Sequence, residues 1–273
     1  MIALPVLPPI VAAALGPVVA GLVWRAGMLT TSGAIVAAVL GSLAALAGLD
    51  WMILLLSFFG SSVALGRVGK VEKLRRSAGV IEKSGPRDAM QVLANGAIFG
   101  IGAYLAIDGT VSAAAGAMAL GALASATADT WGTEFGMLSK RAPRSILTWA
   151  ALEPGMSGGV STQGLLATVA GALSMSLLAW LLRWPLSVTI AAAIGGVIGA
   201  MADSVLGATL QQRRRSRRTG RLTERLCEAD GTPTVIAGGL RWLDNDGVNF
   251  AATLIGAGTA FQVQFLYSLL RHS

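Results

Sequence analysis

The chain has 273 residues, of which 54% are hydrophobic and only 13% are charged, and its formal net charge is +7. Soluble domains carry about 25% charged residues, and several apolar runs here exceed the ~18 residues that mark a membrane span. The composition excludes an ordinary soluble domain and indicates an integral membrane protein. A single cysteine, Cys227, excludes an intramolecular disulfide. The first apolar run lacks a charged leader and a cleavage site, so we expect a retained helix and not a signal peptide.

The apolar runs predict one all-α domain over residues 1–273, a polytopic transmembrane helix bundle with about eight spans and a range of seven to nine. Helices are expected because the bilayer core offers backbone groups no water to bond. A re-entrant segment around 130–158 is left open, since it would change the number of spans. Residues 1–66 are almost wholly apolar and are expected to be scaffold helices, whereas residues 87–250 carry the polar motifs of an expected catalytic core. The predicted spans are residues 4–24, 29–48, 51–66, 88–107, 110–128, 160–182, 186–210 and 248–270.

The basic residues are distributed unevenly if these spans alternate in direction. All 21 Lys and Arg residues except Arg183 and Arg271 then fall on one side, in Arg25 and in the loops between spans. The positive-inside rule predicts that this side is cytoplasmic and that both termini lie outside. The basic loop at 67–87 is compatible with anchoring to anionic membrane lipids, and a run this short gives no reason to expect a nucleic-acid partner.

Two carboxylates, Asp129 and Glu134, lie at the predicted cytoplasmic edge of the fifth span. Carboxylates beside hydrocarbon are costly, which makes them functional candidates. They are five residues apart, about 140° around an ideal helix, and Gly132 between them would let the helix end or unwind so that both face one site. Mg²⁺ usually takes one or two carboxylates together with substrate phosphates. The motif therefore predicts a magnesium site.

A third carboxylate, Asp203, lies in the seventh span within a stripe of small residues, Gly195, Gly199 and Gly207, spaced every four positions. It is about 12 Å inside the cytoplasmic boundary at 1.5 Å per residue. Spans five and seven run in the same direction, so we expect Asp203 and Asp129 to meet at one depth.

The fourth span begins with three polar residues, Arg87, Gln91 and Asn95, at spacing four, so they share one helix face. Hydrogen bonding between helices would explain them, and a binding site would explain them as well. We favour a site because the series starts from an arginine.

A glycine-rich turn, P-G-M-S-G-G-V-S, precedes the sixth span. Gly155, Gly158 and Gly159 can adopt positive φ, and with Ser157 and Ser161 they would present backbone N–H groups at a helix N-terminus. Such an arrangement holds phosphate.

A second polar turn, L-D-N-D-G-V-N, precedes the eighth span. Either Asp244 or Asp246 is a natural N-cap for that helix. Asn245, Asp246 and Asn249 together exceed what a cap requires, so we assign Asp246 and Asn249 to the site.

All of these groups are expected in the cytoplasmic half of the bundle. They supply acids for a metal, amides for hydrogen bonds, glycines for phosphate and an arginine for charge, while the spans supply an apolar wall for a lipid tail. This combination predicts phosphoryl or nucleotidyl transfer to a lipid phosphate at the inner surface of the cell membrane, with the active site facing the cytoplasm.

Five motifs also resemble the signature blocks of domain-of-unknown-function family ninety-two, a family of integral membrane proteins that includes plant phytyl-phosphate kinase. The motifs are Q-V-L-A-N-G (91–96), A-D-T-W-G-T-E (128–134), P-G-M-S-G-G-V-S (154–161), A-D-S-V-L-G-A (202–208) and N-D-G-V-N (245–249). The resemblance implies a kinase that converts an isoprenyl or phytyl monophosphate to its diphosphate. CTP is the implied donor, with ATP or another nucleoside triphosphate as the alternative. Distant kinship with dolichol kinases and phosphatidate cytidylyltransferases implies Mg²⁺.

On this resemblance we expect four catalytic carboxylates to hold one or two Mg²⁺ ions on the triphosphate. These are Asp129, Glu134, Asp203 and Asp246. We expect the glycine turn to cradle phosphate, two basic side chains to neutralise charge, and three amides to orient the acceptor phosphate. The expected substrate and nucleotide contacts are Arg87, Gln91, Asn95, Thr130, Lys140, Ser157, Gly158, Gly159, Ser161, Asn245 and Asn249.

Two other functions remain open from the sequence. A CTP-dependent lipid-phosphate cytidylyltransferase would use much the same residues and differ only in its product. An ion-coupled membrane transporter would also use glycine-rich helices that carry acids within the membrane. The crowding of acids and glycines toward one face favours the enzyme.

Overall fold

The computed structural model describes residues 7–77, 79–80, 85–109, 111–228 and 230–272. Within these residues, eight long helices coincide with the eight expected apolar runs, although residues 4–6 and Thr110 of those runs lie outside the described part. The long helices are α1 (Pro9–Arg25), α2 (Thr31–Ala47), α3 (Leu49–Arg67), α5 (Ala89–Ala106), α6 (Ala113–Gly136), α7 (Thr162–Leu181), α8 (Leu186–Thr209) and α9 (Asn245–His272). A short helix, α4 (Lys70–Arg76), follows α3. The described chain is mostly helical, as expected.

Five of the described helices are long and apolar enough to cross a membrane, namely α3, α5, α7, α8 and α9. The helices α1 and α2 are apolar but have 17 residues each. The 24-residue α6, which carries Asp129 and Glu134, is not among the five. The number of eight spans therefore stays a prediction.

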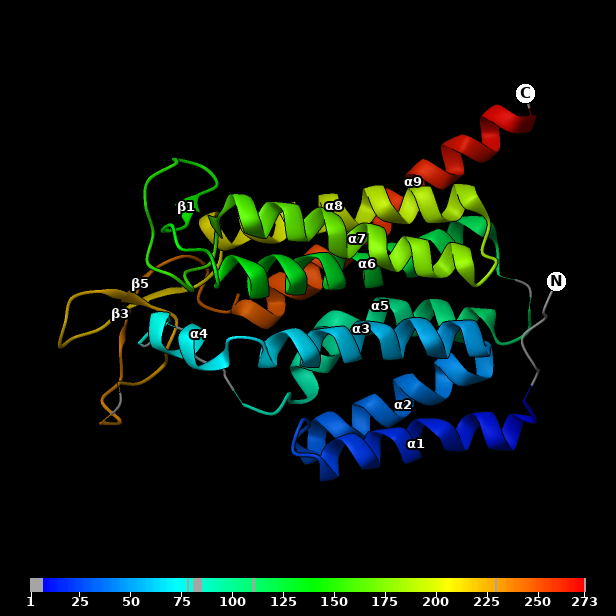
Figure 1. Ribbon diagram of the computed structural model, residues 1–273, viewed down its shortest axis with the longest axis horizontal. Helices are drawn as coiled ribbons and strands as arrows, with labels where there is room; N and C mark the ends of the chain where they lie inside the picture. Colours follow the sequence, from blue (N-terminus) through cyan, green and yellow to red (C-terminus); the bar gives the residue numbers. More distant parts are fainter. Residues whose placement is uncertain (1–6, 78, 81–84, 110, 229, 273) are drawn as a thin grey trace.

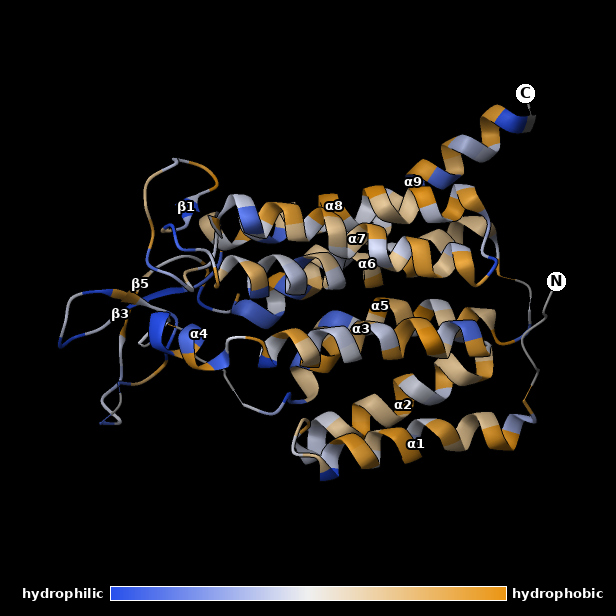
Figure 2. Ribbon diagram, in the orientation of Figure 1, coloured by the Kyte–Doolittle hydropathy of each residue, from blue (hydrophilic) through white to orange (hydrophobic). Residues whose placement is uncertain are grey.

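The long helices run along the long axis of the molecule, and their connections alternate between its two ends (Figure 1). One end carries α4 and five short strands, while α1 begins and α9 finishes at the other. Hydropathy follows the same division, because the helices are mostly apolar and the strand-bearing end is hydrophilic (Figure 2). The described parts of the basic loops thus lie at one end, as the alternation of the spans predicts.

The strands form two small antiparallel sheets that the sequence analysis did not anticipate. Strand β1 (Arg144–Ser145) pairs with β2 (Gly159–Val160), which closes the segment between α6 and α7. Strand β3 (Arg213–Arg215) lies between β4 (Leu222–Thr223) and β5 (Val235–Gly238). The basic run at the start of the connection between α8 and α9 is therefore part of a folded element.

The helix α6 is the centre of the bundle and contacts α3, α5, α7, α8 and α9. Its buried face consists mainly of alanine and glycine, which lets the neighbouring helices approach closely. A Cβ added to Gly256 of α9 would lie 2.8 Å from Ser125 Cβ and 3.0 Å from the Gly195 carbonyl oxygen. The small-residue stripes thus hold α6, α8 and α9 together and fix the relative depth of the acids that they carry.

The first three helices lie along one side of the bundle, with α1 outermost (Figure 1). Helix α1 packs on α2, and α2 packs on α5 and α3. The start of α3 is anchored by Trp51, whose ring centroid lies 5.3 Å from that of Phe99 and 4.9 Å from that of Trp184. The Trp184 indole N–H donates to Asp50 Oδ2 at 2.6 Å. This contact lies far from the hydrophilic end and is structural.

Candidate functional site

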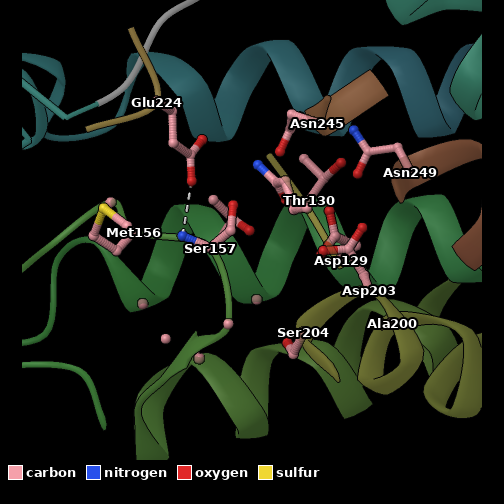
Figure 3. Close-up of a pocket in the computed structure, with 18 of the residues that line it drawn as sticks. Asp129, Thr130, Met156, Ser157, Ala200, Asp203, Ser204, Glu224, Asn245 and Asn249 are labelled. Carbon is pink, nitrogen blue, oxygen red and sulfur yellow. Dashed lines mark hydrogen bonds between the residues drawn. The ribbon is translucent and has the colours of Figure 1, made fainter. Parts of the chain in front are cut away.

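A polar cavity of about 770 Å³ opens at the hydrophilic end of the bundle. Its wall comes from α5, α6, α8 and α9 and from the loops that precede α7 and α9 (Figure 3). The structure brings fourteen of the fifteen expected site residues to this one wall. They are Arg87, Gln91, Asn95, Asp129, Thr130, Glu134, Ser157, Gly158, Gly159, Ser161, Asp203, Asn245, Asp246 and Asn249.

Lys140 is the expected residue that does not line the cavity, since its side chain is exposed. The assignment of Lys140 to the site stays a prediction. A basic residue that does line the cavity is Arg76 of α4. It donates hydrogen bonds to the carbonyl oxygens of Met137 and Ser139, near the end of α6. Sequence reasoning missed Arg76 because nothing in the apolar pattern indicates that α4 folds back over the end of α6.

Asp129 and Asp203 come from α6 and α8, and their carboxylates lie beside each other in the cavity (Figure 3). The two groups interact electrostatically, and Glu224 acts on Asp203 as well. Among the described residues, Asp203 Oδ2 is a buried oxygen that has no hydrogen-bond partner. Two neighbouring carboxylates form the donor set that a hard divalent ion takes.

The four expected metal ligands do not form one cluster. Within the described part of the chain, no three Asp, Glu, His or Cys side chains lie close enough together to hold an ion. Helix α6 also continues without a break to Gly136, so the expected unwinding at Gly132 does not occur. Gly132 instead lets α7 pack closely, because a Cβ there would collide with Thr168 Oγ1 of α7. Asp129 and Glu134 therefore leave the helix in different directions.

Glu134 forms an ion pair that the sequence did not reveal. Its Oε2 lies 2.5 Å from Lys73 Nζ, and the same Nζ donates to the Leu65 carbonyl oxygen at 2.7 Å. The Lys73 side chain is only 9% exposed. Lys73 belongs to the basic loop that was compatible with lipid anchoring, and here it ties α4 to α3 and α6.

The first turn of α9 supplies three cavity residues. Asp244 Oδ1 accepts a hydrogen bond from the Gly247 N–H at 2.9 Å, so Asp244 is the cap of the helix. Asp246 is buried and lines the cavity, together with Asn245 and Asn249. Figure 3 shows the two asparagines beside Thr130 and the paired aspartates. Of the two aspartates that the sequence offered as caps, Asp244 caps the helix, and both line the cavity.

The glycine turn before α7 has positive φ at two of its three glycines, whereas Gly159 is extended in β2. Gly155 and Gly158 have φ values of 93° and 80°, in the left-handed region that glycine tolerates. Gly207 of α8 permits close packing against the turn, since a Cβ there would lie 3.1 Å from the Gly158 nitrogen. Ser161 is the N-cap of α7 and accepts from the Gly164 N–H at 3.1 Å. The turn is thus held rigidly at the cavity wall.

An internal carboxylate already contacts this turn. The Ser157 N–H donates to Glu224 Oε1 at 2.9 Å (Figure 3). Glu224 follows β4 and was missed, as were Arg241 and Gln212 from the same α8–α9 segment, which also line the cavity. The available signal was length, because a connection far longer than about 15 residues is usually functional.

The polar face of α5 is partly explained by local bonds. Gln91 completes a capping box, with its Oε1 accepting from the Asp88 N–H, and the Asn95 amide donates to the Gln91 carbonyl oxygen at 3.0 Å. Arg87 donates to Ser62 Oγ at 2.5 Å, and its guanidinium lies 5.4 Å from the centroid of the Phe59 ring. Burial lowers the pKa of Arg87, and the charge of Glu134 opposes that shift. The guanidinium remains a cation at neutral pH.

Comparisons with known proteins agree with the sequence motifs. The model of one family, described as Integral membrane protein DUF92, matches residues 14–257. An uncharacterized membrane protein from Methanocaldococcus jannaschii is 37% identical over 137 residues, which are 49% of this chain and 53% of that protein. Protein PGR from Arabidopsis thaliana is 34% identical over 145 residues, which are 48% of this chain and 50% of that protein. The chain spans about half the length of these curated relatives. No solved structure matches significantly.

Proposed function

Because this chain belongs to the family described as Integral membrane protein DUF92, we propose that it is a membrane kinase that converts an isoprenyl or phytyl monophosphate to its diphosphate. CTP is the phosphoryl donor, with ATP or another nucleoside triphosphate as the alternative. An oxygen of the lipid phosphate bonds to the γ-phosphorus of the donor. The bond between that phosphorus and the β–γ bridging oxygen breaks, and the nucleoside diphosphate leaves. The reaction takes place at the cytoplasmic face of the inner membrane.

The observation that carries this proposal is the pair of carboxylates, Asp129 and Asp203, at the wall of a polar cavity in an apolar helix bundle. Two acids at this depth are costly unless a ligand neutralises them. A triphosphate accompanied by a divalent cation meets that requirement. A lipid phosphate is a fitting acceptor because the cavity adjoins helices with apolar outer faces.

The residues present fit a magnesium ion. Asp203 Oδ2 is buried without a hydrogen-bond partner among the described residues, and Asp129 lies beside it. Asp129 and Asp203 would hold the ion, and phosphate oxygens and water would complete its shell. When bound, Mg²⁺ neutralises charge that develops on the phosphoryl oxygens. Asp246 lines the same cavity and is proposed to assist, whereas Glu134 is proposed to position α4 through Lys73.

The other groups of the cavity bind and orient the substrates. Three arginines from separate segments of the chain line the cavity and offer positive charge to phosphates. They are Arg76, Arg87 and Arg241. The turn at Ser157 offers a backbone N–H that already binds an anionic oxygen, that of Glu224. A phosphate oxygen is ionised near neutral pH because its second pKa is about 6. The acceptor therefore needs no strong general base.

The cytidylyltransferase remains the second candidate, because the same acids and the same N–H groups suit nucleotidyl transfer. The two reactions differ in the phosphorus that is attacked. Label in the γ-phosphate of CTP enters the lipid product in the kinase reaction, whereas label in the α-phosphate enters it in the cytidylyltransferase reaction.

The test is a product assay on the purified chain in lipid nanodiscs with Mg²⁺. Phytyl, geranylgeranyl and longer prenyl monophosphates are offered with γ-labelled or α-labelled CTP, and with ATP. We expect γ-label in a prenyl diphosphate. Asp129→Asn should abolish the product, and the exposed Asp230→Asn, which lies outside the cavity, should not. Product that carries the α-label, or full turnover by Asp129→Asn, would contradict the proposal.

A further inference from the structure

A second cavity, of about 110 Å³, lies among α1, α2, α3 and α5. Its wall is almost entirely apolar and includes Val19, Ala37, Leu40, Met52 and Leu55. These residues belong to the three helices that the sequence analysis expected to be scaffold. A polar ligand would find few partners in this cavity, so its chemistry suits a hydrocarbon.

The apolar cavity adjoins the polar one. Arg87, Gln91, Asn95 and Thr130 line both. The guanidinium and the two amides therefore lie between the two cavities. The polar cavity on one side is lined by acids and candidate phosphate-binding groups, and the cavity on the other side is lined by aliphatic side chains. An amphiphile could place its phosphate head in the polar cavity and its apolar chain in the other.

One residue of the apolar cavity also belongs to the outer surface of the bundle. Leu56, which lines it, is 39% exposed on α3. Helix α3 is one of the helices long and apolar enough to span a membrane. The cavity therefore lies against a helix whose apolar residues extend to the outer surface, as a site for a lipid chain requires.

We propose that this cavity, which we call the α1–α3 pocket, seats the part of the substrate's isoprenoid chain next to the phosphate and thereby selects the lipid. The proposal rests on the proposed function for its choice of amphiphile. Chains in a bilayer are already in an apolar medium, so the pocket gains little from the hydrophobic effect. The pocket instead selects the chain by its shape, and it aligns the phosphate head group with Arg87 and the polar cavity.

The first experiment locates the chain in the unmodified protein. A prenyl monophosphate with a diazirine on its second isoprene unit is photolysed with the chain in nanodiscs, and the labelled peptides are mapped. We expect label on α1–α3 residues such as Met52 and Leu55, suppressed by unlabelled prenyl monophosphate and not by phosphatidylglycerol. Label only on outer surfaces, or suppression by both lipids alike, would overturn the proposal, since the latter would indicate a site for ordinary membrane lipid.

The second experiment fills the pocket. Ala37→Leu adds three carbons to its wall, and Ala14→Leu makes the same change on an exposed position of α1. We expect Ala37→Leu to lower kcat/KM for geranylgeranyl monophosphate about tenfold or more, the usual scale of an overpacked site, with KM for the nucleotide unchanged. Ala14→Leu should match the unmodified chain. Equal kcat/KM for both variants would overturn the proposal.

The two proposals fail in different ways. Label in the pocket without any phosphoryl transfer would support the chain site and contradict the kinase. Phosphoryl transfer that is insensitive to Ala37→Leu, with label elsewhere, would support the kinase and contradict the pocket.

Discussion

Lys73→Met removes the cation that faces Glu134 and leaves that carboxylate at the cavity wall without its partner. In the structure Lys73 Nζ lies 2.5 Å from Glu134 Oε2, and the two side chains are 9% and 25% exposed. Removing one partner of a fully buried pair costs about 3–5 kcal/mol. The partial exposure of Glu134 lets water screen its charge, so we expect a loss of about 2–3 kcal/mol.

The loss is measured as a shift in the thermal unfolding midpoint. For a domain of this size, 1 kcal/mol corresponds to about 2–4 °C, so Lys73→Met should lower Tm by roughly 4–12 °C in detergent, followed by tryptophan fluorescence. The exposed Lys70→Met on the same helix should leave Tm unchanged. The double variant Lys73→Met/Glu134→Gln should lose less than the sum of its single variants, because neither charge is then left unpaired.

Two results would refute this reasoning. If Lys73→Met unfolds at the same temperature as Lys70→Met, the ion pair does not hold α4 to the bundle. If the double variant loses the full sum of the two single losses, the charges act independently. In either case Glu134 would return to consideration as a metal ligand.

Three further outcomes follow from the packing and charge of the site. Gly256→Ala should lower Tm by several degrees, on the scale of about 1–3 kcal/mol for overpacking, whereas Gly258→Ala, which meets nothing within 4 Å, should not. Arg76→Ala should lower turnover about tenfold through loss of a charged hydrogen-bonding group, and Lys140→Ala should not change it. Glu224→Gln should lower KM for the nucleoside triphosphate several-fold in steady-state kinetics, because it removes an anion that competes for the glycine turn and repels phosphate.

The sequence was sufficient to locate the helices and most of the site. Long apolar runs predict helices because lipid leaves the backbone no other partner. Carboxylates such as Asp129 and Asp203 stand out within such runs because their cost is high. Alternation of the runs then places them at one end, and the structure has both in one cavity.

What the sequence could not supply depends on contacts between segments far apart in the chain. Glycine is compatible with helix unwinding and with close packing, and only the position of α7 shows that Gly132 serves packing. Lys73 and Glu224 sit in charged loops whose composition resembles that of solvated segments. The α1–α3 pocket is built from aliphatic residues, and their sequence pattern is the same in a packed core as in the wall of a cavity. In each case the local sequence identifies the residue but does not show which distant residue it contacts.

The most direct test of the account is the transfer of γ-labelled phosphate from CTP to geranylgeranyl monophosphate by the unmodified chain and by Asp203→Asn, at equal concentrations of folded protein and across a range of Mg²⁺. We predict labelled geranylgeranyl diphosphate from the unmodified chain, and a rate at least about 10²-fold lower from Asp203→Asn, the scale of losing a group that stabilises charge in the transition state. Equal rates from the two proteins, or labelled product that does not depend on Mg²⁺, would contradict the claim that the paired aspartates hold the ion on which phosphoryl transfer depends.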